Sequence, residues 1–140
     1  MDAALSTTAP RRHSTVLQAV VILRGLHPEL TPNAQLSFLY ICENDGLSVS
    51  ELSELCGFSI TTASRASRSL AEADAPGALA PYVGLVELRP DPFDARSRLI
   101  FLNGRGKRLR AELDSLIAEA TQMAPLDLEP AAPVLARRWA

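Results

Sequence analysis

Apolar residues recur at helical spacing along five stretches of the chain. The first stretch begins at Ser14, which can cap a helix, and ends before Pro28. The second begins at Thr31-Pro32, a capping residue followed by a proline suited to the first helical position. It ends near Gly46. Each apolar face needs a partner, so these helices are expected to pack on one another or on a second chain.

The next two helices lie close together in the sequence. Ser48 and Glu51 match a capping box at the start of a short helix, and Gly57 is placed to end that helix. Ser59 then caps a longer helix over residues 60–73. Because only three residues separate the two helices, the pair has the spacing of a helix-turn-helix.

The longer helix has one apolar and one polar face. The stripe expected to face inward consists of small and aliphatic residues: Ile60, Ala63, Ala66, Leu70 and Ala73. The opposite face carries only hydroxyls and guanidinium groups: Thr61, Thr62, Ser64, Arg65 and Arg68. Small hydroxyls allow close approach to a DNA groove, and arginines reach base edges or phosphates. An ordinary solvated helix face is the alternative interpretation.

After this helix the period changes from helical to alternating. Residues 84–89 and 96–102 read as two strands on either side of a Pro- and Asp-rich turn at residues 90–94. This pattern predicts a β-hairpin, and the second strand carries Arg96 and Arg98. Asn103 can then cap a last long helix, residues 104 to about 123.

Together these elements predict a mainly α fold with a small β-hairpin wing, that is, a winged helix-turn-helix domain plus N- and C-terminal dimerisation helices. The expected divisions are a flexible arm (1–13), a winged-helix domain (14–123) with a DNA-binding core (31–103) and dimerisation helices (14–28 and 104–123), and a Pro-rich tail (124–140).

The first and last helices carry apolar stripes that are long for so small a domain. We expect them to form the seam of a homodimer through Val16, Leu17, Val20, Val21, Leu109, Leu113, Leu116 and Ile117. A two-fold dimer would place two reading helices roughly 34 Å apart, one in each of two successive major grooves. The alternative is that the stripes belong to the core of a single chain.

The charge of the chain matters through its distribution. The net charge is −2, from 14 Lys and Arg against 16 Asp and Glu, which alone would argue against phosphate binding. Eight of the basic residues, however, fall in the reading helix, the hairpin and the start of the last helix: Arg65, Arg68, Arg96, Arg98, Arg105, Lys107, Arg108 and Arg110. Arginine suits bidentate contacts to guanine and phosphate.

Other function classes find little support in the sequence. No nucleophile stands beside a base and no phosphate-cradling glycine loop follows a strand, so we expect no enzyme. Two histidines lack zinc spacing, so neither a metal nor a cofactor is implied. The apolar stretch 14–23 is shorter than the roughly 20 residues of a membrane span. No secretory signal precedes it, and we expect a cytoplasmic protein without membrane contact.

The two cysteines, Cys42 and Cys56, are too few for a disulfide framework. Both stand at apolar helix positions, so they are expected to be small buried hydrophobes with raised pKa values. Redox sensing by one of them is the alternative.

Residues 47–70 and the stretch GLVELRPDPFDARSRLIFLNGRG (residues 84–106) resemble the MarR family of winged-helix transcriptional regulators. The second stretch is similar to the family's GLV strand, its Asp-x-Arg wing and its Leu-Thr-x-x-Gly entry to the next helix. The resemblance implies that residues 59–74, beginning at Ser59, form the recognition helix. It also implies that Asp94 orients Arg96 toward the DNA backbone or minor groove, and that Arg98 adds a phosphate contact.

The chain departs from the family pattern in three places. Residues 75–83 intervene between the recognition helix and the GLV strand, and their role is open. The proline-rich tail lacks the final helix that many members use in dimerisation. Asn103 replaces the usual threonine, a mild change since both cap helices.

The resemblance implies a sequence-specific regulator of transcription that binds double-stranded DNA. In this family such a protein is more often a repressor, and we expect a homodimer on an inverted-repeat operator. A small-molecule effector between the dimer helices and the winged domain is a further partner that the resemblance admits. The alternative, which the overall acidity keeps open, is a winged-helix protein–protein interaction module acting as a cofactor or antagonist of another regulator.

Overall fold

The computed structural model describes residues 12–122 of the 140-residue chain. The tail expected over 124–140, and all of the expected arm but its last two residues, lie outside the described residues. The elements, in chain order, are α2 (Arg12–Leu26), α3 (Pro32–Glu43), β1 (Leu47–Ser48), α4 (Val49–Cys56), α5 (Ile60–Ser69), β2 (Val86–Asp91), β3 (Asp94–Leu102) and α6 (Gly104–Gln122). This order confirms the predicted winged helix-turn-helix architecture.

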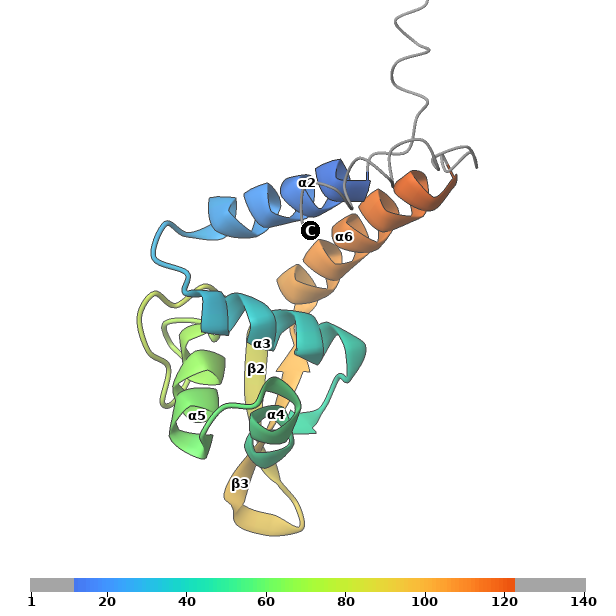
Figure 1. Cartoon of the computed structure of the whole chain (residues 1–140). Helices are drawn as coiled ribbons and strands as arrows, with labels where there is room; N and C mark the ends of the chain where they lie inside the picture. The colour runs from blue at the N-terminus through green and yellow to red at the C-terminus, as the bar shows by residue number, and fades with distance from the viewer. Residues whose placement is uncertain (1–11, 123–140) are drawn as a thin grey trace, which may run out of the picture.

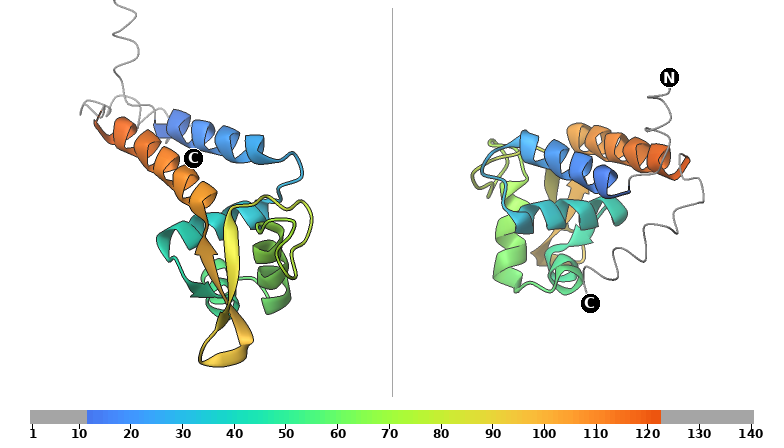
Figure 2. Two further views of the ribbon diagram at one scale, coloured as in Figure 1. Left: turned by 180° about the vertical axis from the view of Figure 1, so that it is seen from behind. Right: turned by 45° about the horizontal axis from the view of Figure 1, so that its top comes forward.

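Helices α2 and α6 lie together at one end of the molecule, and the β2–β3 hairpin projects from the other end (Figure 1). Between them, α3 runs beneath α2, and α4 and α5 pack on α3 and on each other. The view from behind shows the same division into a helical end and a hairpin end (Figure 2). None of the described helices is long and apolar enough to cross a membrane.

The local start and stop signals act as predicted in α3 and α4. Thr31 caps α3, and its hydroxyl accepts a hydrogen bond from the backbone N–H of Ala34 at 3.1 Å. In α4 the Ser48 hydroxyl accepts from the Glu51 N–H at 3.1 Å, and the Glu51 carboxylate accepts from the Ser48 N–H at 2.9 Å. This is the complete capping box. Gly57, with a left-handed φ of 74°, ends the helix.

Two predicted helix boundaries are wrong. Helix α2 begins at Arg12, so Ser14 lies inside the helix and does not cap it. Helix α5 ends at Ser69 and not near Ala73, because Ala71 forms a parallel bridge with Val86 at the start of β2. This tertiary pairing ends the helix although the helix propensity of the following residues would allow it to continue.

The inward stripe of α5 is correspondingly shorter than predicted. Ala63, Ala66 and Leu70 are buried, as expected. Ile60 is 59% exposed because it opens the helix beyond the edge of the core, and Ala73 is exposed because it follows the helix.

The sheet has three antiparallel strands in the order β1-β3-β2. The two-residue strand β1 was not predicted; Leu47 pairs with Ile100 of β3. Both hairpin strands extend further into the turn than expected, so only Pro92 and Phe93 connect them. Pro90 is tolerated within β2 because β2 is an edge strand, and the register shifts after it.

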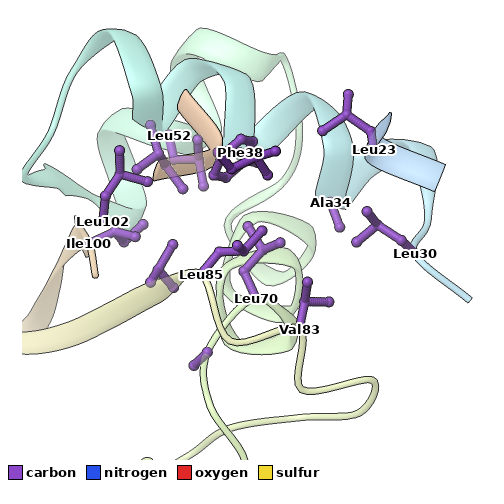
Figure 3. Packing of buried hydrophobic residues seen from close by; sticks show 14 of the residues in the cluster. Leu23, Leu30, Ala34, Phe38, Leu52, Leu70, Val83, Leu85, Ile100 and Leu102 are labelled. Carbon is purple, nitrogen blue, oxygen red and sulfur yellow. The ribbon is translucent and has the colours of Figure 1, made fainter. Parts of the chain in front are cut away.

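A single cluster of buried side chains joins the helices to the sheet (Figure 3). Phe38 of α3, Leu52 of α4 and Leu70, which directly follows α5, lie in it and are at most 1% exposed. Leu85 and Ile100 of the hairpin region are equally buried. The recognition helix and the hairpin are therefore held in fixed relation by one core.

The contacts at the turn into α6 explain the Leu-Asn-x-x-Gly sequence of residues 102–106. The Asn103 side chain accepts from the Gly106 N–H at 2.9 Å and donates to the Gly84 carbonyl at 3.0 Å, which confirms it as the cap. A side chain at Gly106 would overlap the Leu85 carbonyl and lie 3.1 Å from a methyl carbon of Leu102. Glycine is thus the residue that lets α6 approach the chain entering β2.

Candidate nucleic-acid interface

Helix α5 presents its polar face because its apolar side is anchored in the core. Thr61 and Arg65 are exposed, and Thr62 and Ser64 are half-buried along the edges of that face. Ser67 is fully buried and donates its hydroxyl proton to the Ser64 carbonyl at 2.9 Å, so it needs no outside partner. The outward face is thus made of hydroxyls and a guanidinium, as the sequence predicted.

The first turn of α5 is ordered by its own hydroxyls. The Ser59 hydroxyl accepts from the Thr62 N–H at 3.1 Å and donates to the Thr62 hydroxyl at 3.0 Å. Ser59 is therefore the helix cap, with its side chain turned to its own helix. The remaining donors of this first turn point out of the helix end, where anionic groups are stabilised.

The two arginines of α5 have different surroundings. The Arg68 Nε atom donates to the Gly77 carbonyl at 2.7 Å, which fastens the inserted loop 75–83 to the end of the helix. The loop also returns to α5 through the Leu79 N–H, which donates to the Arg68 carbonyl at 3.0 Å. Arg65 has no side-chain partner among residues 12–122. It lies beside a shallow hollow between α5, the start of α3 and the loop.

The hairpin tip is shaped by two aspartates. The Asp91 carboxylate accepts from the Phe93 N–H at 2.9 Å, and the Asp94 carboxylate accepts from the Arg96 N–H at 3.0 Å. Asp94 therefore binds the backbone N–H of Arg96. The resemblance to the MarR family had implied a contact with the guanidinium group instead. Asp94 orders the turn and leaves the Arg96 side chain free to move.

Arg96 and Arg98 are exposed, and neither side chain has a partner within the described part of the chain. Arg89, which the sequence did not single out, already has partners within the hairpin. Its guanidinium pairs with Glu87 at 3.1 Å and lies 4.2 Å above the ring centre of Phe101. The hairpin thus offers two available arginines, and both stand on β3.

The start of α6 contributes less positive charge to this surface than its sequence suggested. An Nη atom of Arg105 donates to the Val83 carbonyl, and one of Arg110 donates to the Cys42 carbonyl at 3.5 Å. These arginines join α6 to the body of the protein. Of the basic run, Lys107 and Arg108 remain exposed on α6.

The hairpin tip and α5 lie at the same end of the molecule, away from α2 and α6 (Figures 1 and 2). The bridge between Ala71 and Val86 ties the end of α5 to the start of β2, far from the tip. The N-terminal end of α5 is consequently the end of this helix that lies nearer the tip. The helix and the hairpin that carry the predicted residues thus lie at one end of the fold.

The two cysteines are half-buried, where the sequence pattern predicted buried residues. Burial raises the pKa of Cys42 to about 12, against the opposing effect of the Arg110 guanidinium. Burial also raises the pKa of Cys56. Because the thiolate is the reactive form, a raised pKa favours the structural interpretation of both residues.

The predicted dimer residues fall into three groups by exposure. Leu109 and Leu113 are buried in the protomer's own core, at 7% and 6% exposure, as the intramolecular alternative required. Leu116 is half-buried. The others remain open on the surface at 45–63% exposure: Val16, Leu17, Val20, Val21 and Ile117. The apolar face left for a partner is therefore mainly that of α2.

A scan of the sequence against models of known protein families gives no match, and a search of curated protein sequences gives none either. The fold, in contrast, is found among solved structures. A crystal structure of the S. aureus MepR–DNA complex matches with a TM-score of 0.61 at 18% identity, covering 91% of each chain.

Two further structures show the same similarity. A crystal structure of MarR has a TM-score of 0.54 at 16% identity and covers 91% of this chain and 90% of its own. The PcaV transcriptional regulator from Streptomyces coelicolor, in complex with its natural ligand, has a TM-score of 0.50 at 25% identity and covers 88% and 84%. The chain therefore has the winged helix-turn-helix fold of the MarR-type transcriptional regulators.

Proposed function

We propose that this protein is a MarR-family transcriptional regulator that binds double-stranded DNA in a sequence-specific manner. The observation that carries the proposal is that the polar face of α5 and the free arginines of β3 lie at one end of the fold. A recognition helix reads base edges in the major groove, and a wing beside it contacts the backbone or the minor groove. The neighbouring MepR structure is a complex with DNA.

The residues proposed to contact DNA divide by chemistry. Thr61 and Arg65 are the exposed base-reading candidates, with Thr62 and Ser64 at the margins of the same face. Arg96 and Arg98, together with the first turn of α5 behind Ser59, are suited to phosphates. Asp94 supports Arg96 through the backbone. Arg68 stays on this surface as a prediction, since its Nη atoms are not used in the contact with the loop.

We further propose that the protein acts as a homodimer on an inverted repeat, most simply as a repressor that occludes a promoter. The exposed apolar face of α2 supports the dimer, because monomeric proteins rarely leave so long an aliphatic stripe in water. A small-molecule effector is a further proposal, motivated by the ligand complex of PcaV.

The proposed function is tested by selecting duplexes from a randomised DNA pool with the wild-type protein and titrating the best duplex at several salt concentrations. We expect enrichment of one inverted repeat. With six or more phosphate contacts, its affinity should fall about 1000-fold between 50 and 200 mM salt. If no sequence is enriched and binding shows no salt dependence, the protein–protein interaction module becomes the better account.

A further inference from the structure

The apex of the hairpin carries a phenylalanine where a DNA-binding wing would be expected to carry a cation. Phe93 is 96% exposed, more than any other large apolar residue that the structure describes. Burying a phenylalanine side chain stabilises a fold through the hydrophobic effect, and this exposed ring contributes almost nothing of that kind to the protomer. Phe93 lies in the predicted turn, outside the alternating strands, so the periodicity of the sequence assigns it no role.

The backbone beneath the ring is held in place. The Phe93 N–H donates a hydrogen bond to the Asp91 carboxylate, and the Arg96 N–H donates one to the Asp94 carboxylate. The cross-strand pairing reaches Pro90 with Arg98, shifts register after Pro90, and is taken up again by Asp91 with Asp94 directly beside the turn. A ring presented on such a braced turn loses little conformational entropy when it enters a binding partner.

The charges around the tip argue against a purely electrostatic role. Two carboxylates, Asp91 and Asp94, stand within three residues of the ring, against two free guanidinium groups, Arg96 and Arg98. The tip is thus close to neutral, and it gains little from the release of counterions around DNA. An almost fully exposed phenylalanine ring stands at its apex, at the end of the hairpin that projects from the body of the protein (Figure 1).

We propose that Phe93 is an apolar wedge, which enters the minor groove of the bound duplex and partly unstacks one base step while Arg96 and Arg98 contact the flanking phosphates. The inference rests on the proposed DNA-binding function. Minor-groove proteins insert phenylalanine and leucine between base steps in this way and kink the duplex. Because pyrimidine–purine steps unstack most easily, the wedge would add a preference for a TA or CA step beneath the wing.

The test uses the full-length protein and the duplex selected by the wild type, with the fluorescent base 2-aminopurine placed in turn at each position flanking the half-sites. We expect wild-type binding to raise the fluorescence at one step per wing, because unstacking relieves quenching. Phe93→Ala should weaken binding about 10- to 100-fold, the range found for loss of an aromatic–base stack. It should abolish the fluorescence change and leave the salt slope unaltered.

Two variants serve as controls. Phe93→Leu keeps a wedge and should retain most of the affinity and the fluorescence change. Arg98→Ala should lower the salt slope by about 1 per lost phosphate contact while the fluorescence change persists. These opposite patterns separate an apolar wedge from a phosphate contact.

Three outcomes overturn the proposal. If Phe93→Ala binds the selected duplex as the wild type does, with the same fluorescence, the wedge is wrong while the proposed DNA-binding function stands. If Phe93→Ala lowers the salt slope as Arg98→Ala does, the tip contacts phosphates and does not insert. If the wild type enriches no duplex, both proposals fail together.

Discussion

Replacing Gly106 with alanine should lower the free energy of unfolding by about 3 kcal/mol, the upper part of the range for overpacking a rigid site. The added carbon would overlap the Leu85 carbonyl, which belongs to the backbone and cannot rotate away as a side chain would. Relief requires α6 to move off the segment that enters β2. Chemical denaturation of the purified variant measures the change.

Gly104→Ala is the matched control, in the same first turn of α6. A carbon added there meets only the end of the Arg108 side chain, at 3.5 Å, which is an ordinary contact. Its stability should stay within about 1 kcal/mol of the wild type. Equal stability of the two variants would show that the approach of α6 to Leu85 does not constrain the fold.

Replacing Leu17 and Val21 together with glutamate should give a monomer and weaken operator binding at least 100-fold. These side chains are 61% and 59% exposed, one turn apart on α2, so the changes should spare the protomer's core. Charges in an apolar seam oppose association. A monomer also loses the gain from engaging two linked half-sites, about 100- to 10000-fold. Light scattering gives the mass, and anisotropy titration gives the affinity.

Gln18→Glu, on the same helix but off the stripe, should remain dimeric and bind as the wild type does. If the double variant stays dimeric, the seam lies elsewhere. If it becomes monomeric but binds the operator unchanged, a single winged helix is sufficient and the inverted-repeat proposal is wrong.

The parts of the fold that the sequence predicted best depend on neighbours within four residues. The helix caps are examples: Thr31 and the Ser48–Glu51 pair accept hydrogen bonds from N–H groups at the start of a helix, and Gly57 ends one. All act as their residue types indicated. The end of α5 was misplaced because a partner 15 residues along the chain, Val86, captures Ala71. Residues spaced three or four apart in the sequence do not reveal such a pairing, because its partner lies in a distant segment.

The candidate site shows the same limit. The hydroxyls and Arg65 face outward because an apolar stripe opposite them is buried, which periodicity reveals. Loop geometry, which residue type does not specify, determines two other contacts. These are the hydrogen bond from Arg68 to the Gly77 carbonyl and the one from the Arg96 N–H to the Asp94 carboxylate. Phe93 is prominent only once the turn is seen to leave its ring without a cover.

In the proposed complex, α5 and the wing act on one duplex, with α5 reading the bases and the wing contacting the backbone. Titrating Arg65→Ala and Arg96→Ala against the selected duplex and a single-base variant of it tests this most directly, with Arg24→Ala on α2 as the charge-matched control. We predict that Arg65→Ala loses about 1–3 kcal/mol of discrimination between the duplexes, that Arg96→Ala weakens both alike, and that Arg24→Ala changes neither. Wild-type binding and discrimination in both Arg65→Ala and Arg96→Ala would contradict the account.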